Sequence, residues 1–540
     1  MKKRSSIFLV SVLMISLLAA CTQSPSATPS TDAPPASGGT ATEKPADDKP
    51  SEPEAPKEPT KFSIGMRTLN VKYVENHANI NDDPYVKALE RFTNTDLDIR
   101  LIPHAEYETK MVQMFATNDL TDVIQASGGI SGKELAGSVE AGVFVDLKPY
   151  LEEHGKALLE TIPEAAWERV TDAEGHIYGI PEYLGNPSRR ATWIRMDLLE
   201  KTGLPVPKTV DEFLEVLRAF KKLGVEEPFA GRAEFKYADT FFGAYDVFGY
   251  GNELELVDGK MQPKFLDVEN MQAAIGVYKT MYDEGLMSKE FATVNPNTFK
   301  ATITSGKAGM WSMNANELPI WGEQLVNNVP EAKVALIPSP IGPDGKGGYS
   351  LYSPVTRSFL ITKQAEDKVV DIIKFFEWQT TEEAKLFFSY GLEGTDYAMN
   401  GSEPAYKAPE TNEELDKQRY LNYWLWMVQD TTYNELVLSQ TEEGRALIEI
   451  YDTMLANEGR DGYEFNDPLE AWVNNPDINP FSDRYPPLIN EHIMKMVFGQ
   501  EPIADWPKVI EEWRSKGGDA LIEEATKKYN EGAVVYAPQR

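Results

Sequence analysis

The chain has 540 residues, and 85 acidic against 53 basic residues give it a formal net charge of -32 at pH 7. This charge argues against a nucleic-acid partner, because affinity for a polyanion comes mainly from Lys and Arg that neutralise phosphates. A single cysteine excludes a disulfide within the chain, so packing must stabilise the fold. The chain after Thr60 is too long for one hydrophobic core, which predicts two lobes.

The beginning of the chain predicts an export signal. Residues 2–4 are basic, residues 7–20 are almost all apolar, and the only cysteine, Cys21, follows. Secretory signals have this order, and the apolar run is short for a helix that spans a bilayer. Residues 18–21 (LAAC) resemble the bacterial lipobox, in which the chain is cut before a cysteine that receives a diacylglyceryl group. We expect a signal peptide over residues 1–20 and lipidation of Cys21.

The next stretch has the composition of a linker. Residues 22–60 are rich in Pro, Ser, Thr, Ala, Asp and Glu and contain no aromatic residue. Such a sequence cannot bury enough apolar surface to repay the entropy of folding. We therefore expect a flexible tether over residues 21–60, which would hold the folded part a few tens of ångströms from the membrane.

Strands and helices alternate in the first part of the folded chain. Apolar periodicity predicts strand, helix, strand, helix and strand, in this order, at residues 61–66, 83–92, 97–102, 106–116 and 122–125. This alternation favours a largely parallel sheet covered on both faces, with ligands bound beyond the carboxyl ends of its strands. Arg67 and Ser127 lie at such ends. Gly128 and Gly129 either form a turn or bring backbone close to a ligand.

Later segments continue the α/β pattern. A capping box of Thr209 and Glu212 starts a helix that Gly224 ends. Further on we expect a strand at residues 358–362, a helix at 367–378, and a helix at 380–390 that opens with a capping box and stops at Gly391. The remaining chain is mostly helical, and its breaks are expected at Asn-Pro and Pro-Pro pairs.

Motifs for catalysis are missing from the sequence. Residues 342–348 (GPDGKGG) lack the spacing and the final Ser or Thr of a phosphate-binding loop. The five histidines show no metal-ligand spacing, and no G-x-S-x-G motif supports a serine hydrolase. We expect no enzyme, no cofactor and no metal. A secreted glycosidase stays an alternative, because the separation of its two carboxyl groups is not visible in a sequence.

Several stretches mix aromatic and polar residues in the way that sugar sites require. Sugars stack their C–H faces on aromatic rings and offer hydroxyl groups to polar side chains. The stretches are residues 237–250, 311–321, 349–352 and 420–426. Each aromatic residue in them is explained either by core packing or by ligand contact.

An ordered set of motifs resembles a known family. These motifs are residues 177–181 (IYGIP), 192–222 (TWIRMDLLEKTGLPVPKTVDEFLEVLRAFKK), 305–311 (SGKAGMW), 342–363 (GPDGKGGYSLYSPVTRSFLITK), 390–397 (YGLEGTDY) and 498–513 (FGQEPIADWPKVIEEW). Together they resemble the extracellular solute-binding proteins of family 1, in the long lipoprotein branch that includes alginate-binding and other oligosaccharide-binding members. The resemblance covers nearly the whole folded part.

The resemblance implies a type II periplasmic-binding-protein fold, with two α/β lobes and a ligand cleft between them. The N-terminal lobe is expected over residues 61–185 and 341–402, and the C-terminal lobe over 186–340 and 403–540. The implied function is to capture an oligosaccharide by lobe closure and to deliver it to the permease of an ABC transporter. The protein would be a monomer, anchored to the outer face of the cytoplasmic membrane. A peptide or other solute receptor, or a sensor of the same fold, is the alternative.

The resemblance also carries over individual residues. Ser188, Arg189 and Arg190 match a lobe crossing that contacts sugar, residues 237–245 a ring-stacking segment, and residues 311–316 a contact loop in which this chain has asparagines where some relatives have an aromatic residue. With the strand ends and aromatic stretches, the candidate ligand-binding residues are Arg67, Ser127, Ser188, Arg189, Arg190, Tyr237, Asp239, Phe241, Tyr245, Trp311, Asn314, Asn316, Tyr349, Tyr352 and Trp424.

The charged residues raise two further points, the absence of a calcium loop and the role of two neighbouring arginines. Relatives often carry a calcium loop after the capped helix, whereas residues 221–231 (KKLGVEEPFAG) lack the cluster of carboxylates that calcium needs, so we expect no calcium site. Arg189 and Arg190 either grip a ligand carboxylate through paired hydrogen bonds or pair with acidic side chains of the chain itself.

Overall fold

The computed structural model describes residues 58–536 except 131, 133, 136, 238, 408, 466–468 and 481–483, with backbone alone at 319, 320, 323 and 534–536. Residues Glu58–Arg540 form one compact unit, and Met1–Lys57 are a separate unit. The expected signal peptide, Cys21 and nearly all of the expected tether therefore lie outside the described residues. Within the described part, no helix has both the length and the apolar composition to span a membrane.

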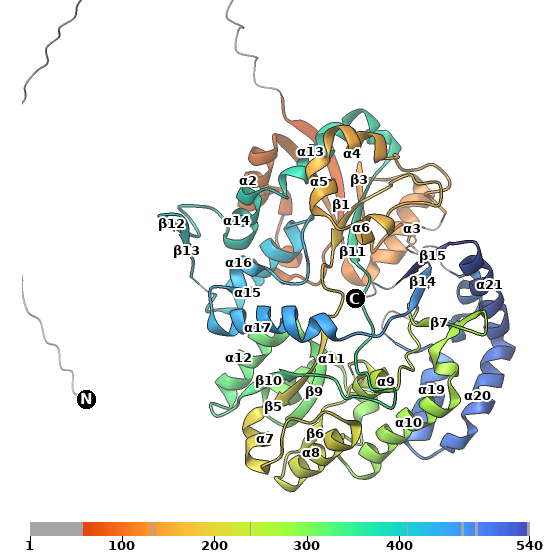
Figure 1. The fold of residues 1–540 in the computed structure, drawn as a ribbon. Coiled ribbons are helices and arrows are strands. Elements are labelled where there is room, and N and C mark those ends of the chain that lie inside the picture. The colour runs from red at the N-terminus through yellow and green to blue at the C-terminus, as the bar shows by residue number, and fades with distance from the viewer. Residues whose placement is uncertain are drawn as a thin grey trace, which may run out of the picture. The chain divides into compact units, whose positions relative to one another are not determined.

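The first lobe is built on a five-stranded sheet with the order β2-β1-β3-β11-β4. Its strands are β1 Thr60–Arg67, β2 Thr95–Ile102, β3 Val123–Ser127, β4 Ile180–Tyr183 and β11 Val355–Ile361 (Figure 1). β1 pairs in parallel with β2 and β3, and β11 runs antiparallel to both β3 and β4. The predicted alternation of strands and helices is confirmed, with α2 Pro84–Thr93 and α3 Tyr107–Thr117 between the first three strands.

Both faces of this sheet are covered. Val123 and Ile361 point into one core cluster, and their neighbours Ile124 and Leu360 point into another, as expected from the two-residue period of a strand. The other helices of this lobe are α1 Lys72–Asn76, α4 Lys148–His154, α5 Lys156–Thr161, α6 Glu164–Glu168, α13 Val369–Trp378, α14 Glu382–Tyr390 and α15 Asn412–Arg419.

One predicted helix start is corrected by the structure. The helix expected over residues 380–390 was expected to open with a capping box, but the N-cap of α14 is Thr381, whose hydroxyl accepts a hydrogen bond from Ala384 N at 3.2 Å. The carboxylate of Glu383 instead accepts a hydrogen bond from Trp378 Nε1 at 3.1 Å. The third residue after the cap of α14 is Ala384, which has no side chain that could complete a capping box.

The second lobe is built on a four-stranded sheet with the order β10-β5-β9-β6. Its strands are β5 Arg190–Arg195, β6 Glu227–Phe229, β9 Ala308–Asn314 and β10 Val334–Ile337. Trp193 and Trp311 pack into the core on one face, and Ile194 and Met310 into the core on the other. The main helices of this lobe are α7 Met196–Thr202, α8 Val210–Lys222, α9 Thr240–Ala244, α10 Val268–Asp283, α11 Pro296–Thr304, α12 Leu318–Asn328, α17 Glu442–Thr453, α18 Glu470–Asn474, α19 Pro487–Val497, α20 Trp506–Trp513 and α21 Asp519–Asn530.

The predicted cap of α8 is confirmed. The hydroxyl of Thr209 accepts from Glu212 N, and the carboxylate of Glu212 accepts from Thr209 N at 3.1 Å. Gly224, which was expected to end the helix, follows two residues after Lys222 with a φ of 87°, the left-handed conformation that favours glycine.

Two smaller sheets complete the described part. One has the strand order β15-β14-β7-β8 and joins the second lobe, because Leu254, Met261 and Phe465 of its strands pack into that lobe's core. Its strands are β7 Leu254–Val257, β8 Lys260–Pro263, β14 Tyr463–Phe465 and β15 Val534–Tyr536. The other is a hairpin of β12 Ala398–Asn400 and β13 Glu403–Ala405, which projects at the left of Figure 1, and the short helix α16 Glu435–Leu438 follows later in the chain.

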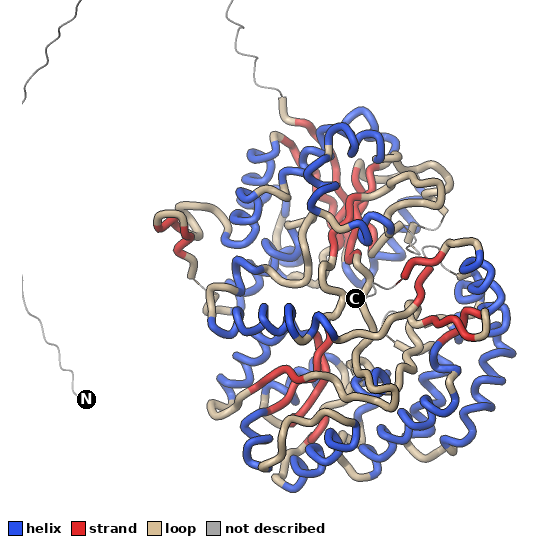
Figure 2. The backbone as a smooth tube through the Cα atoms, in the orientation of Figure 1, coloured by secondary structure: helices blue, strands red, loops and turns tan. Residues whose placement is uncertain are grey.

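Three segments run between the two lobes and lie side by side. After β4, Tyr183 N donates to Gln429 O at 3.1 Å and Thr431 N donates to Tyr183 O at 2.8 Å. Leu184 N donates to Pro354 O at 2.8 Å. These bonds hold the chain between β4 and β5 against the segment that enters β11 and against residues 429–431, which are drawn as loops in Figure 2. The chain thus passes from lobe to lobe three times.

The core of the first lobe also includes residues from beyond the hairpin. Tyr420 and Trp424 are fully buried there and stack at 5.7 Å, and Val428 belongs to the same cluster. The expected boundary at residue 402 assigns them to the other lobe. The expected lobe boundaries stay predictions, and this packing favours a return to the second lobe after Val428.

Candidate ligand-binding site

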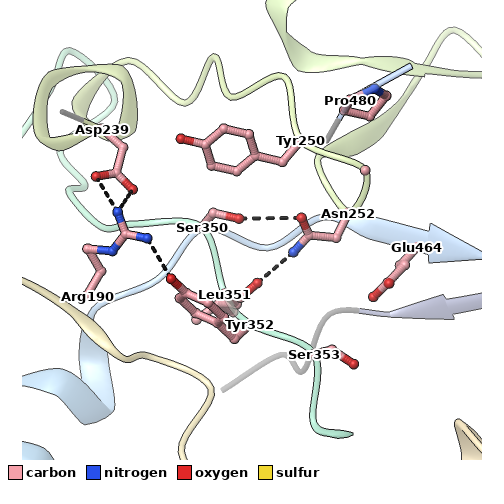
Figure 3. A pocket seen from close by; sticks show the side chains of 11 residues that line it. Arg190, Asp239, Tyr250, Asn252, Ser350, Leu351, Tyr352, Ser353, Glu464 and Pro480 are labelled. Carbon is pink, nitrogen blue, oxygen red and sulfur yellow. Dashed lines mark hydrogen bonds and ion pairs between the residues drawn. The ribbon is translucent and has the colours of Figure 1, made fainter. Parts of the chain in front are cut away.

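A cavity of about 280 Å³ lies where the segment before β11 meets the second lobe. Its walls come from β5, the start of α9, the turn before β7, the crossing segment and β14 (Figure 3). The lining residues are Arg190, Asp239, Tyr250, Gly251, Asn252, Ser350, Leu351, Tyr352, Ser353, Glu464 and Pro480. Two tyrosine rings among amide, hydroxyl and carboxylate groups make this a mixed apolar and polar site, as small-molecule sites usually are.

Arg190 organises one end of the cavity. Its Nη1 lies 3.1 Å from each carboxylate oxygen of Asp239, and its Nη2 donates to the hydroxyl of Tyr352 at 2.6 Å. The guanidinium also lies 4.5 Å from the ring centre of Tyr237. Arg190 and Asp239 are both almost completely buried. The sequence left open whether Arg190 binds a ligand carboxylate or pairs with an acidic side chain of the chain. The structure shows the second arrangement, in which Arg190 pairs with Asp239 and positions Tyr352.

Tyr352 is held on several sides. Its hydroxyl donates to Asn314 Oδ1 at 3.4 Å, and its backbone N donates to Pro187 O at 3.0 Å. Asn314 is opposite Arg190 in the pairing of β5 with β9, which explains how two predicted residues far apart in sequence meet at one tyrosine. The guanidinium carbon of Arg189 lies 5.3 Å from the centre of the Tyr352 ring. Tyr352 is thus a fixed aromatic surface in the cavity wall.

The other end of the cavity is polar. Asn252 Nδ2 donates to Leu351 O at 2.6 Å, and Ser350 Oγ donates to Asn252 Oδ1 at 3.5 Å. Behind them, Lys264 Nζ lies 2.8 Å from a carboxylate oxygen of Glu253, and both side chains are buried. Burial raises the pKa of Glu253 to about 7, against the opposing effect of the Lys264 charge. The side chain of Asn252 is therefore held at the cavity by Leu351 and Ser350.

The two lobes meet directly at the cavity edge. Arg169, just after α6 in the first lobe, places Nη2 at 2.5 Å from Glu464 Oε1 on β14 of the second lobe. The same Nη2 donates to Ser353 Oγ at 3.4 Å. Glu464 and Ser353 both line the cavity. An ion pair between lobes therefore forms part of the site.

Arg67 and Ser127 lie together at the carboxyl ends of β1 and β3, as the sequence predicts, although neither lines the cavity. Arg67 Nη1 donates to Ser127 Oγ at 3.1 Å, and its guanidinium lies 4.7 Å from the ring centre of Tyr107. Ser127 N donates to Glu134, whose pKa is raised by burial.

The two glycines after Ser127 have structural roles. Gly128 has a φ of 79°, and a Cβ at Gly129 would lie 2.1 Å from the carbonyl oxygen of Arg169. Glycine is needed at Gly129 because the backbones approach so closely. The geometry therefore explains both glycines by a turn, without a backbone contact to a ligand.

Four predicted aromatic residues are in the cores instead of the cavity wall. Their side chains are at most 1% exposed, and they are Phe241, Trp311, Tyr349 and Trp424. Phe241 packs edge to face on Phe213, Trp311 lies 5.7 Å from Trp193, and the hydroxyl of Tyr349 bonds to that of Thr192. Of the two roles that the sequence allowed for these rings, core packing and ligand contact, core packing explains their positions.

The remaining predicted residues flank the site. Tyr237 lies behind Arg190, and Tyr245 is half-buried against the second-lobe core. Ser188 is buried, with its hydroxyl donating to Glu458 O. Asn316 is half-buried just after β9. Of the predicted set, Arg190, Asp239 and Tyr352 line the cavity.

Sequence reasoning missed most of the polar lining. Tyr250 ends the aromatic stretch 237–250, and Ser350 lies inside 349–352, so composition could have singled them out. No local pattern marks Glu464 or Pro480, which reach the cavity only through the tertiary fold. Among the described residues, no group of three His, Cys, Asp or Glu side chains could hold a metal ion.

Comparisons with known proteins agree with this architecture. LipO of Bacillus subtilis is 25% identical over 470 residues, covering 83% of this chain and 88% of LipO. The polygalacturonan/rhamnogalacturonan-binding protein YtcQ of the same organism is 25% identical over 476 residues, with the same coverage. The crystal structure of the alginate-binding protein AlgQ2 without calcium ion matches with a TM-score of 0.66 at 19% identity, covering 88% of this chain and 98% of that chain.

The family model described as bacterial extracellular solute-binding protein matches residues 78–386, which is more than half of the 540 residues. The match includes β5, β9 and β11 with the crossing segments between them, and hence most of the cavity wall. The chain belongs to the family of bacterial extracellular solute-binding proteins.

Proposed function

We propose that the protein captures an oligosaccharide between its lobes and delivers it to the permease of an ABC importer. The cavity carries this proposal, because it combines the rings of Tyr250 and Tyr352 with the amide of Asn252, the hydroxyl of Ser350 and the carboxylate of Glu464. Rings that stack on sugar faces and polar groups that bond hydroxyls are what sugar recognition requires. The relative YtcQ, a polygalacturonan/rhamnogalacturonan-binding protein by name, supports the same ligand class.

The proposed mechanism is a shift between open and closed forms. Three crossing segments join the lobes. Arg169 of the first lobe forms an ion pair with Glu464 of the second lobe at the cavity edge. A ligand that touches both lobes binds the closed form more tightly than the open one and so shifts the equilibrium toward closure. The permease would then recognise the closed form.

The proposed location is the outer face of the cytoplasmic membrane. A lipid on Cys21 and the tether over residues 21–60 would anchor a monomeric binding protein there. The extracellular solute-binding family and the relative LipO, a lipoprotein by name, support this placement. Since the family binds solutes, we propose no enzymatic activity for the chain.

A thermal-melt screen tests the ligand class. Residues 58–540 carry their own cores and can be used without the preceding segment. Ligand at one hundred times its dissociation constant adds about 2.7 kcal/mol to the free energy of unfolding, which raises the melting temperature. We expect a rise with one or more of maltotetraose, kestose, tetragalacturonate and tetramannuronate, and recovery of the sugar unchanged by mass spectrometry.

Matched variants of Tyr352 sharpen the screen. Tyr352→Ala removes the ring and should abolish the ligand-dependent rise, whereas Tyr352→Phe keeps the ring and should retain most of it. A rise with a tetrapeptide and with no saccharide would refute the carbohydrate assignment. Shortened sugars after incubation would show a glycosidase instead.

A further inference from the structure

We infer that the ligand is an acidic oligosaccharide whose carboxylates are bound by Arg67 on the first lobe and Arg189 on the crossing into the second. This inference rests on the proposed function and specifies the charge of its ligand. It starts from an unusual feature of these two side chains. In the described part of the chain, neither has a carboxylate within 4 Å, the ion-pair distance.

Arg189 is a half-buried cation with no acidic side chain at ion-pair distance among the described residues. Its Nε is shielded from solvent and makes no hydrogen bond within the described structure. Its guanidinium lies over the ring of Tyr352, which fixes the plane of the group beside the cavity. A planar guanidinium held on an aromatic face keeps its outer N–H groups available for a carboxylate.

Arg67 repeats this arrangement in the other lobe. Its Nε is likewise shielded and without a hydrogen-bond partner in the described part of the chain, and its guanidinium lies over the ring of Tyr107. The neighbouring His104 offers no negative charge, and burial followed by the Arg67 charge lowers the pKa of its imidazole. Within the described structure Arg67 donates to the neutral hydroxyl of Ser127 and to the backbone oxygen of His104, and its charge opposes the rise in the pKa of the buried Glu134 without a direct ion pair.

Three other buried arginines around the site are each paired with a carboxylate. Arg190 is paired with Asp239, Arg169 with Glu464, and Arg357 with Glu182 at 2.5 Å. With 85 acidic residues against 53 basic ones, carboxylates are plentiful. Keeping a cation partly out of water without a carboxylate partner costs free energy, and a ligand carboxylate with two charge-assisted hydrogen bonds would recover it.

The two arginines are linked through contacts to the same stretch of chain, residues 352–356. Arg189 packs on Tyr352, and Gly128, next to Ser127, donates from its backbone N to Thr356 O at 3.1 Å. Tyr352 and Thr356 are four residues apart, so the backbone between them spans at most about 14 Å. Since neither arginine lines the cavity itself, the ligand extends past the cavity at both positions. Linked uronic acids, with one carboxylate on each ring, would offer a carboxylate to each arginine.

Calorimetric titration of residues 58–540 tests the inference. The probes are tetragalacturonate, tetramannuronate and the carboxyl-reduced form of each, which keeps the linkage and loses the charge. We expect one of the acids to bind at least tenfold more tightly than its reduced form. Arg67→Met and Arg189→Met should each weaken the acid about tenfold or more and change the affinity for the reduced form by less than threefold.

Three controls make the result decisive. Arg218→Met, which removes a partly exposed arginine paired with Glu284, should leave every affinity unchanged. Both site variants should melt close to the parent without ligand, because neither removes an ion pair of the described structure. Equal affinity for an acid and its reduced form, or equal losses for both in the variants, would overturn the inference while oligosaccharide binding stands. Failure of every saccharide to bind would overturn the proposed function with it.

Discussion

Arg169 Nη2 lies 2.5 Å from Glu464 Oε1, and this pair joins the first lobe to the second at the cavity edge. Arg169 is 6% exposed and Glu464 28% exposed, so water screens the pair only in part. Because the two residues belong to different lobes, the pair stabilises the arrangement of the lobes seen in this structure. An opening of the lobes would hydrate both groups.

Removal of this pair should open the ligand-free protein. For Arg169→Met and for Glu464→Gln we expect a larger radius of gyration of residues 58–540 by small-angle X-ray scattering, because the closed form loses a contact that the open form lacks. The Arg218→Met variant breaks a pair within the second lobe and should leave the radius unchanged. Identical scattering from all four proteins would show that the pair does not control closure.

Asp239→Asn should weaken both the fold and the binding. The substitution leaves Arg190 buried without its counter-charge, which costs roughly 3 kcal/mol in the free energy of unfolding. It also loosens the Arg190 guanidinium that fixes Tyr352, so we expect ligand affinity to fall more than tenfold. Urea unfolding and calorimetry measure the two effects. The exposed Asp211→Asn is the matched control, and equal behaviour of the two variants would contradict the assigned role.

Glu253 should make stability depend on pH. Burial raises the pKa of its carboxyl group to about 7, above the value near 4.3 of an exposed glutamate. The folded state therefore binds the proton more tightly, and the contribution of Glu253 to stability is present below about pH 4.3 and is lost as pH rises through about 7.

We accordingly expect Glu253→Gln to gain stability relative to the parent as pH rises from 5 to 8. Chemical unfolding at several pH values measures the difference between the two proteins, which cancels the titration of all other groups. A difference that is independent of pH, or that falls with rising pH, would mean that Glu253 is ionised throughout beside Lys264.

Trp311 should matter for folding and not for binding. It is fully buried against Trp193, so Trp311→Leu should lower the free energy of unfolding by about 3 kcal/mol. Affinity for the ligand should stay within twofold of the parent at a temperature where the variant is folded. A large loss of affinity with little loss of stability would place this ring in the site after all.

Local patterns predicted the fold better than the site. Strands such as β1 and β3 and helices such as α2 and α8 follow from apolar periodicity and from caps such as Thr209, which are properties of neighbouring residues. The pairing of Arg190 with Asp239, 49 positions later, depends on the tertiary fold. The same holds for Glu464, which comes to the cavity on a strand far along the chain.

Aromatic residues show a second limit of sequence reasoning. Composition predicted a role for Phe241 and Trp311, but an aromatic residue has the same identity in a core and in a cavity wall. The cores take both rings because α9 and β9 are covered by other elements on the sides where these rings point. Tyr352 lines the cavity because it lies on the crossing segment before β11 and not within a sheet strand.

The central claim is that an oligosaccharide binds between the lobes on Tyr352. Calorimetric titration of residues 58–540, Tyr352→Phe and Tyr352→Ala with the saccharide that gives the largest rise in melting temperature tests it most directly. The account predicts one ligand per chain, a dissociation constant for Tyr352→Phe within tenfold of the parent, and at least a hundredfold weaker binding to Tyr352→Ala. Unchanged binding to Tyr352→Ala would contradict the account, because the ligand would then lie elsewhere.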